Sequence, residues 1–96
     1  MIIKTVRSSS LKYAKRIKIL IDKYEDGNLY IGLFTMSGEP YTDITTHLGV
    51  SLNHPLGYVE ANSEAERFVK EQKLGIDLNR SIKSGFNTYN LYRFEI

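Results

Sequence analysis

The amino-acid sequence predicts an α+β fold: an antiparallel sheet of four to six strands with one amphipathic helix packed on one face. Three observations support this prediction. Residues 16–46 alternate apolar and polar side chains around two turn sequences, which is typical of a β-meander. Residues 63–74 begin with a helix-start signal and continue with apolar residues at helical spacing. Residues 86–96 return to alternation and predict a final strand.

The meander contains three expected strands and both of their turns. Isoleucines at alternate positions from 17 to 22 have the period of a half-buried strand. Asp26-Gly27 then supplies residues that tolerate positive φ in a tight hairpin. Residues 29–36 form the second expected strand and residues 37–40, SGEP, the second turn. Residues 41–46 are rich in Thr and Tyr, as strands prefer, and complete the meander.

The helix is predicted to start at Asn62 or Ser63, because residues 63–66 read Ser-Glu-Ala-Glu. In such a capping box the Ser oxygen accepts from the backbone N–H of Glu66, and the Glu side chain reaches back. Gly75 follows Leu74 and is the expected residue just beyond the helix end. The apolar stripe consists of Ala65, Phe68, Val69 and Gln72. The charged residues expected to face water are Arg67, Lys70, Glu71 and Lys73.

The remaining segments have weaker patterns. Residues 1–13 start with an apolar patch and continue into three serines, so we expect either a short edge strand or a flexible basic arm. Residues 47–58 are broken by Gly and Pro and are expected to be mainly loop, followed by a short strand at 58–60. Residues 76–85 are polar and are expected to form a loop or irregular turn. We interpret residues 1–96 as one domain.

The amino-acid composition excludes several kinds of site and of cellular location. The 96 residues include no Cys, which excludes disulfides and thiolate metal sites. We find neither a signal peptide nor an apolar segment long enough to span a membrane, so we expect a cytoplasmic protein with no membrane partner. No cofactor and no metal ligand set is expected from the sequence.

Charge is segregated along the chain, although the formal net charge is only +2. Residues 1–24 hold seven basic residues and one acidic residue, a net charge of +6. Residues 25–66 hold seven acidic residues and no Lys or Arg, a net charge of −7. Residues 67–96 have a net charge of +3. Either these charges neutralise one another across the fold, or they create a bipolar surface that steers charged partners.

Catalytic motifs are not evident. The chain has no G-x-S-x-G elbow, no P-loop and no G-x-G-x-x-G. The only histidines, His47 and His54, have no carboxylate spacing that matches a zinc or hydrolytic motif. We therefore expect a protein that is not an enzyme, and a small enzyme that uses one of these histidines is the weakest of our hypotheses.

Basic residues near the N-terminus and tyrosines in the expected strands are the candidate binding residues. Lysine and arginine can meet phosphates, and a Tyr-studded sheet face can dock a protein or stack bases. The candidates are Lys12, Lys15, Arg16, Lys18, Tyr30, Tyr41, Asp43, Tyr89, Tyr92 and Arg93. Lys4 and Arg7 would join the basic residues if the partner is a nucleic acid.

Four blocks of the sequence carry a family resemblance: residues 28–33 (NLYIGL), 38–45 (GEPYTDIT), 64–75 (EAERFVKEQKLG) and 84–94 (SGFNTYNLYRF). In this order they resemble an uncharacterised family of short proteins from conjugative transposons, plasmids and phages of Gram-positive and gut bacteria. The resemblance covers residues 16–96 and leaves out the Ser-rich basic start. Within it, His47-Leu48-Gly49 and Asn87 depart from the pattern, which often has Asn-Leu-Pro and Cys at these places.

This resemblance implies a context and no activity. Accessory proteins of mobile elements commonly bind and block host machinery, so the leading hypothesis is a non-enzymatic protein that inhibits or modulates a host protein. Its specific version is a defence inhibitor of the anti-CRISPR or anti-restriction kind. The alternative is a nucleic-acid-binding accessory protein that uses the basic N-terminal segment. A homodimer is also an open expectation for so small a domain.

Overall fold

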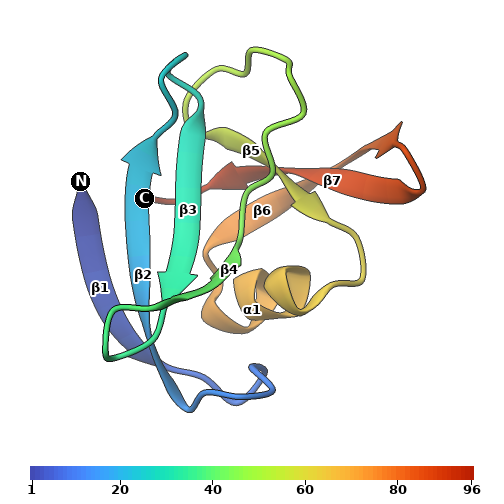
Figure 1. Cartoon of the computed structure of the whole chain (residues 1–96). Coiled ribbons are helices and arrows are strands. Elements are labelled where there is room, and N and C mark those ends of the chain that lie inside the picture. The colour runs from blue at the N-terminus through green and yellow to red at the C-terminus, as the bar shows by residue number, and fades with distance from the viewer.

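The structure is a computed structural model that describes residues 1–96 as seven strands and one short helix (Figure 1). In chain order the elements are β1 (Ile2–Arg7), β2 (Arg16–Lys23), β3 (Leu29–Phe34), β4 (Pro40–Asp43), β5 (Leu56–Glu60), α1 (Glu64–Gln72), β6 (Gly75–Ser84) and β7 (Asn87–Phe94). The α+β class is confirmed. The strands form two antiparallel sheets where the sequence predicted one: a four-stranded sheet of order β1-β2-β3-β4 and a three-stranded sheet of order β5-β7-β6.

The predicted meander forms the first sheet, with β1 added at its edge. β1 pairs with β2 over its whole length, from Ile2 opposite Ile21 to Arg7 opposite Arg16. The edge-strand interpretation of the N-terminus therefore holds for Ile2–Arg7. Side chains alternate across a strand, so the isoleucines of β2 all point to one face, where Ile17 and Ile19 are at most 1% exposed.

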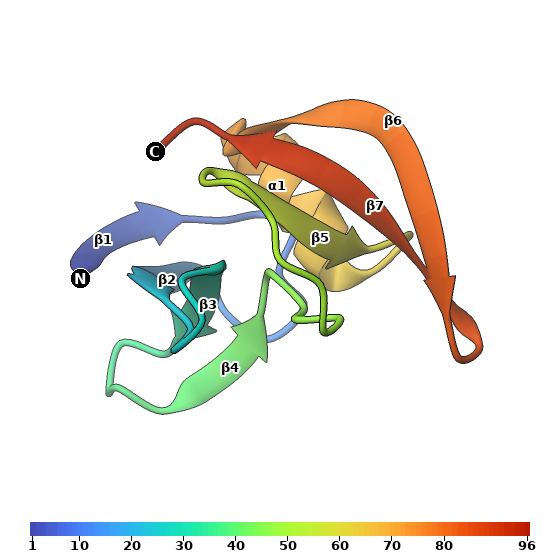
Figure 2. The same cartoon turned by 90° about the horizontal axis from the view of Figure 1, so that it is seen from above.

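The core lies between the two sheets and includes the helix. Figure 2 shows α1, β5, β6 and β7 on the same side of the first sheet. Fourteen buried residues form one apolar cluster, to which β2, β3, α1 and β7 all contribute. Phe68 and Val69 on the predicted helix stripe are fully buried in it. The other face of the first sheet has no layer over it (Figures 1 and 2).

The helix begins as predicted and ends two residues earlier than predicted. Ser63 is the N-cap, and its Oγ accepts from the backbone N–H of Glu66 at 3.1 Å. At the other end Lys73 takes the left-handed conformation, with φ of 53°. Gly75 already belongs to β6, where a Cβ would lie 2.9 Å from the backbone oxygen of Arg93. Gly75 is thus required by the close approach of β7.

β6 corrects the expectation of a loop at residues 76–85. It is an edge strand of the second sheet, and its last six residues are all exposed. A solvent-exposed edge strand needs no apolar alternation, so its sequence does not resemble a strand. Its pairing with β7 is also interrupted between Asp77 and Ser81, where Asn79 has a positive φ of 57°.

Candidate functional site

The loop between β1 and β2, together with the first residue of β2, holds three of the five predicted basic candidates. We call residues 8–15 the serine loop. Its ends are held together by the last pair of the ladder, Arg7 opposite Arg16, and by the Ser8 N–H, which donates to the Lys15 carbonyl at 2.8 Å. The loop therefore continues a rigid two-stranded ribbon.

Glu71 on α1 accepts hydrogen bonds from all three serines. Its Oε1 accepts from the hydroxyls of Ser8 and Ser10, each at 2.7 Å. Its Oε2 accepts from Ser9 twice, from the backbone N–H at 2.6 Å and from the hydroxyl at 2.7 Å. The expectation that Glu71 faces water is wrong, because its carboxylate is surrounded by loop donors.

These donors fix the charge of Glu71. Burial pushes the pKa of its carboxyl upward, but the hydrogen bonds from Ser8, Ser9 and Ser10 outweigh burial and hold the pKa well below its ordinary value. The carboxylate is therefore ionised at neutral pH and stays an acceptor for the loop.

A second carboxylate of the same helix holds the other half of the loop. Glu64 Oε2 accepts from the Lys12 N–H at 2.6 Å and from the Tyr41 hydroxyl at 3.1 Å. The Tyr41 oxygen in turn accepts from the Tyr13 N–H at 3.1 Å. Between these contacts Leu11 inserts into the core and is only 7% exposed.

Glu64 and Glu71 are seven residues apart, so they lie two turns apart on one side of the helix. With the two carboxylates as anchors and a buried leucine between them, the serine loop has a defined shape. It is not the flexible arm that its three serines suggested.

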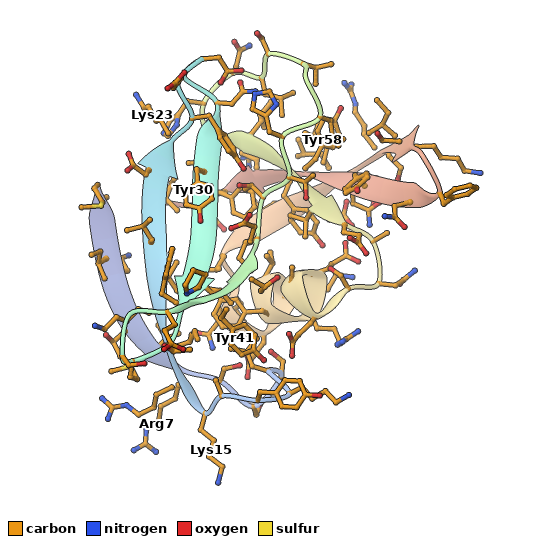
Figure 3. The ribbon with its side chains drawn as sticks, viewed as in Figure 1. Arg7, Lys15, Lys23, Tyr30, Tyr41 and Tyr58 are labelled. Carbon is orange, nitrogen blue, oxygen red and sulfur yellow. The ribbon has the colours of Figure 1, made fainter.

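The outer side of the loop is basic and hollowed. An open hollow of about 1000 Å³ is bordered by Arg7, Lys12, Tyr13, Lys15 and Arg16, together with Ser8, Ser9 and the carboxylate-bearing Glu71. In Figure 3 the side chains of Arg7 and Lys15 project from the same end of the molecule, away from both sheets. The Tyr13 ring is 79% exposed, and Lys12 Nζ lies 5.4 Å from its centroid.

None of the basic side chains around the hollow has an acidic partner. The only ion pair in the structure joins His47 to Asp26, in the loops at the far ends of β2 and β4. The four cations therefore form no ion pair within the protein, and the Glu71 carboxylate in the same hollow is occupied by the serine donors. An external anion would meet these cations on a fixed backbone.

The structure brings three predicted candidates together, Lys12, Lys15 and Arg16, and adds Arg7. Lys18 is two residues into β2, half-buried on the face that no other layer covers. Arg93 is exposed on β7 in the second sheet. The basic candidates thus form one cluster with two outlying members.

The tyrosines do not form the exposed docking face that the sequence suggested. Tyr89 is 9% and Tyr92 1% exposed, so neither is available to a partner, and that expectation is wrong for both. Both faces of β7 are covered along this stretch, and the Tyr92 hydroxyl donates to Glu66 at 2.9 Å. Tyr41 is half-buried and anchors the serine loop through Glu64.

Tyr30 and Asp43 form a local pair on the uncovered face. The Tyr30 hydroxyl donates to Asp43 Oδ1 at 2.9 Å. Burial, followed by this hydrogen bond to a carboxylate, raises the pKa of Tyr30 to about 12. The Tyr30 hydroxyl therefore stays protonated and remains a donor at physiological pH.

Of the two histidines, only His47 has structural partners. His47 Nδ1 accepts from the Gly49 N–H at 2.9 Å, and its Nε2 contacts Asp26. These bonds tie the β2–β3 turn to the loop that follows β4. His54 is exposed. No group of three or more His, Asp or Glu side chains is arranged to hold a metal ion.

Two features of the site were not predicted from the sequence: the hydrogen bonds from the serines to Glu71, and the exposed Tyr13 ring among the cations. Tyr13 had a local signal, since it lies between Lys12 and Lys15. Glu71 had none, because its partners are more than sixty residues away along the chain.

Residues 18–96 match a protein family described as "Domain of unknown function (DUF4313)", and since this is most of the chain, the protein belongs to that family. The match agrees with the sequence expectation of an uncharacterised family beginning near residue 16. It starts within β2, so β1 and the serine loop precede it. Neither a curated protein nor a solved structure matches the chain. No helix is long and apolar enough to cross a membrane.

Proposed function

We propose that this DUF4313 protein is a non-enzymatic cytoplasmic binding protein whose serine loop binds the phosphates of a nucleic acid. The supporting observation is the group of four cations without acidic partners, Arg7, Lys12, Lys15 and Arg16, around one open hollow. Phosphate contacts of this kind supply most of the affinity of sequence-independent binding.

The shape of the loop supports the same proposal. Glu64 and Glu71 fix the backbone from the inside, so the cations need little ordering when they bind. The exposed ring of Tyr13 lies among them. Proteins that bind single-stranded nucleic acids stack the bases on aromatic rings of this kind, next to cations that contact the backbone. Single-stranded nucleic acid is therefore the expected form.

The test is a fluorescence anisotropy titration of a labelled single-stranded oligonucleotide over a series of salt concentrations. Four phosphate contacts predict a log–log salt slope of about −3 on single strands. Alanine at Lys12, Lys15 and Arg16 should weaken binding at least tenfold and flatten the slope by about 2. The matched control replaces Lys23, Lys73 and Lys83, which changes net charge equally. Equal losses in both variants, or no binding at low salt, would overturn the proposal.

The variant Glu71→Gln tests whether nucleic-acid binding depends on the fixed shape of the serine loop or only on net charge. The substitution removes a negative charge near the hollow, so charge alone would strengthen binding of an anion. If the carboxylate is needed to hold the loop, binding weakens instead, because Ser8, Ser9 and Ser10 lose their charged acceptor. Glu95→Gln is the control with the same charge change at an exposed site.

A second candidate is that the protein is an accessory factor of a mobile element that binds and inhibits a host protein, in the manner of an anti-CRISPR or anti-restriction factor. The resemblance of residues 16–96 to such accessory proteins supports the context. β1 supports the binding mode, because it is an edge strand of six residues with one side unpaired. Open edges of this kind accept an added strand from a partner.

The two candidates are distinguished by affinity capture of the tagged protein from lysate, with and without nuclease, read by mass spectrometry. A stoichiometric host protein that survives nuclease, and is lost when Thr5 on β1 is replaced by Pro, supports the second candidate. Recovery that disappears with nuclease supports the first. Unchanged plasmid interference by CRISPR and restriction systems would eliminate the defence-inhibitor version.

A further inference from the structure

We propose that the uncovered face of the first sheet is a docking surface for a second copy of this chain, packed face to face with its strands running in the opposite direction. This inference is independent of the nucleic-acid proposal. The outer face is defined here as the side chains of Ile3, Lys18, Leu20, Asp22, Tyr30 and Phe34.

The face is apolar at its centre and no layer of this chain covers it. In Figure 2 the helix and the second sheet lie on the other side of β2 and β3. Ile3 is 57% exposed, while Leu20, Tyr30 and Phe34 are half-buried. A sheet face of this composition in a monomer is unusual, since its apolar side chains gain more from burial than from water.

The strand register arranges these side chains in rows across the sheet. Ile3 lies opposite Leu20, and Leu20 lies opposite Gly32. Gly32 has no side chain, and the Tyr30 ring fills its place, because a Cβ there would lie 2.1 Å from the Tyr30 hydroxyl oxygen. The middle row is therefore a continuous apolar strip across β1, β2 and β3.

Charged residues flank this strip with opposite signs. Lys18 and Asp22 lie on the same side of β2, two residues before and two residues after Leu20. In the neighbouring strand Lys18 lies opposite Phe34, and Asp22 lies opposite Tyr30. Arg16 extends the positive end, whereas Asp43, bonded to Tyr30, lies opposite Gly32 in the row of Leu20.

The charges of this face match those of a second copy in one of two possible orientations. A two-fold axis in the interface plane, perpendicular to the strands and passing through Leu20, places Leu20 on Leu20, and Lys18 of each copy on Asp22 of the other. A two-fold axis along the strand would instead oppose Lys18 to Lys18, which like charges disfavour. The charges thus select the antiparallel arrangement, an isologous interface of the kind that homodimers use.

The arrangement also matches apolar rows between the copies. The rotation keeps β1 over β1 and β3 over β3, so Ile3 meets Ile3, and the Tyr30 ring, which lies over Gly32 in the middle row, meets the Tyr30 ring of the other copy. Aromatic pairs of this type add to the area that is buried. Because only a few apolar side chains of each copy contribute to the interface, we expect a weak dimer that forms at micromolar to millimolar concentration.

The test is sedimentation equilibrium of the full chain over that concentration range, using Lys18→Glu and Asp22→Lys. Each variant alone opposes like charges at both contacts of the two-fold interface, so its dimer dissociation constant should rise at least tenfold. Mixed in equal amounts, the two variants restore opposite charges at both contacts and should form a heterodimer near wild-type affinity. That recovery also shows that both variants are folded.

The controls are Lys83→Glu and Glu95→Lys, which make the same charge changes on the second sheet and beyond it. Both should dimerise like the wild type. A wild-type chain that stays monomeric at millimolar concentration would overturn the proposal and leave the face to another partner. Single variants that dimerise normally, or a mixture that does not recover, would overturn the antiparallel arrangement.

Discussion

The two sides of α1 each hold a carboxylate in a shell of hydrogen-bond donors, and the donors come from opposite parts of the molecule. Glu66, 4% exposed, accepts from Asn90 Nδ2 at 2.7 Å, from the Tyr92 hydroxyl at 2.9 Å and from the Asn62 N–H at 2.9 Å. Glu71 accepts only from its neighbour Gln72 and from the serine loop. One carboxylate ties the helix to the second sheet, and the other ties it to the first.

The two carboxylates differ in whether their hydrogen-bond donors would keep their positions if the carboxylate were removed. The donors to Glu66 belong to β7 and to the turn before the helix, and they are held in place by the core whether or not the carboxylate is present. Apart from Gln72, the donors to Glu71 belong to the serine loop, whose first three residues have Glu71 as their shared acceptor. Glu66 should therefore govern the stability of the whole domain, whereas Glu71 should govern the order of the loop.

The largest expected effect is that of Glu66→Ala. It leaves the Tyr92 hydroxyl and the Asn90 amide without a charged acceptor, so the free energy of unfolding should fall by about 3 kcal/mol. Urea denaturation followed by circular dichroism measures this loss. Tyr92→Phe, which removes only one donor, is the control and should cost about 1 kcal/mol. A loss below that of the control would contradict the role given to Glu66.

The sequence predicts the Glu66 side of this comparison better than the Glu71 side. The cap of the helix, its apolar stripe and the meander all depend on residues within about four positions of one another, which is the range where turn chemistry and periodicity act. Ser63 and Glu66 were identified in this way. The second role of Glu66, as acceptor for Asn90 and Tyr92, has no local signal, because β7 is more than twenty residues away.

The candidate site was only partly predictable for the same reason. Lys12, Lys15 and Arg16 are close in sequence, so their clustering could be inferred. The contact of Ser8 with Glu71 could not, since it joins the first loop to the end of the helix. Tyr92 was wrongly predicted to be exposed, because both faces of β7 are covered and the alternation of side chains along a strand does not reveal this.

Glu71→Ala is expected to have a smaller global effect and a larger local one. The free energy of unfolding should fall by only about 1 kcal/mol, because the loop keeps its contacts to Glu64 and its buried Leu11. In the unsubstituted protein the Ser9 amide donates to Glu71, so native-state hydrogen exchange in the variant should be faster at this amide. Exchange at Ile19 in β2 should be unchanged. Faster exchange throughout the domain would show that Glu71 supports the whole core.

Acid titration compares the two carboxylates in one experiment. Burial raises the pKa of Glu66, but hydrogen bonds from Asn90, Asn62 and Tyr92 outweigh burial and lower the pKa below the ordinary 4.5; the pKa of Glu71 is also lowered. A carboxyl whose folded-state pKa is depressed stabilises the protein above its unfolded-state pKa, and this stability is lost as pH falls. The free energy of unfolding should therefore decline as pH falls below about 5.

Variants separate the two contributions to this decline. Glu66→Gln should remove the contribution of Glu66 to the pH dependence of the free energy of unfolding of the whole domain. Glu71→Gln should leave most of that curve in place and instead remove the pH dependence of amide exchange in the serine loop. Identical changes in both variants would mean that the two sides of the helix unfold as one unit.

The smallest expected effect is that of Ser9→Ala. Ser9 is exposed, and Glu71 Oε2 still accepts from the Ser9 backbone N–H after the hydroxyl is removed. Oε1 keeps the hydroxyls of Ser8 and Ser10. The free energy of unfolding should change by less than about 0.5 kcal/mol, as for most surface substitutions. Chemical denaturation and amide exchange of the loop are the measurements.

Ser8→Ala sharpens this last comparison, because Ser8 is only 8% exposed and its oxygen also accepts from the N–H groups of Ser10 and Leu11. Its loss leaves two loop amides without an acceptor in a partly buried place and should cost about 1 kcal/mol. If Ser8 and Ser9 proved equal, the serines would act only as interchangeable donors to Glu71. A larger cost at Ser8 would mean that this residue organises the turn of the loop, while Ser9 and Ser10 complete the shell around the carboxylate.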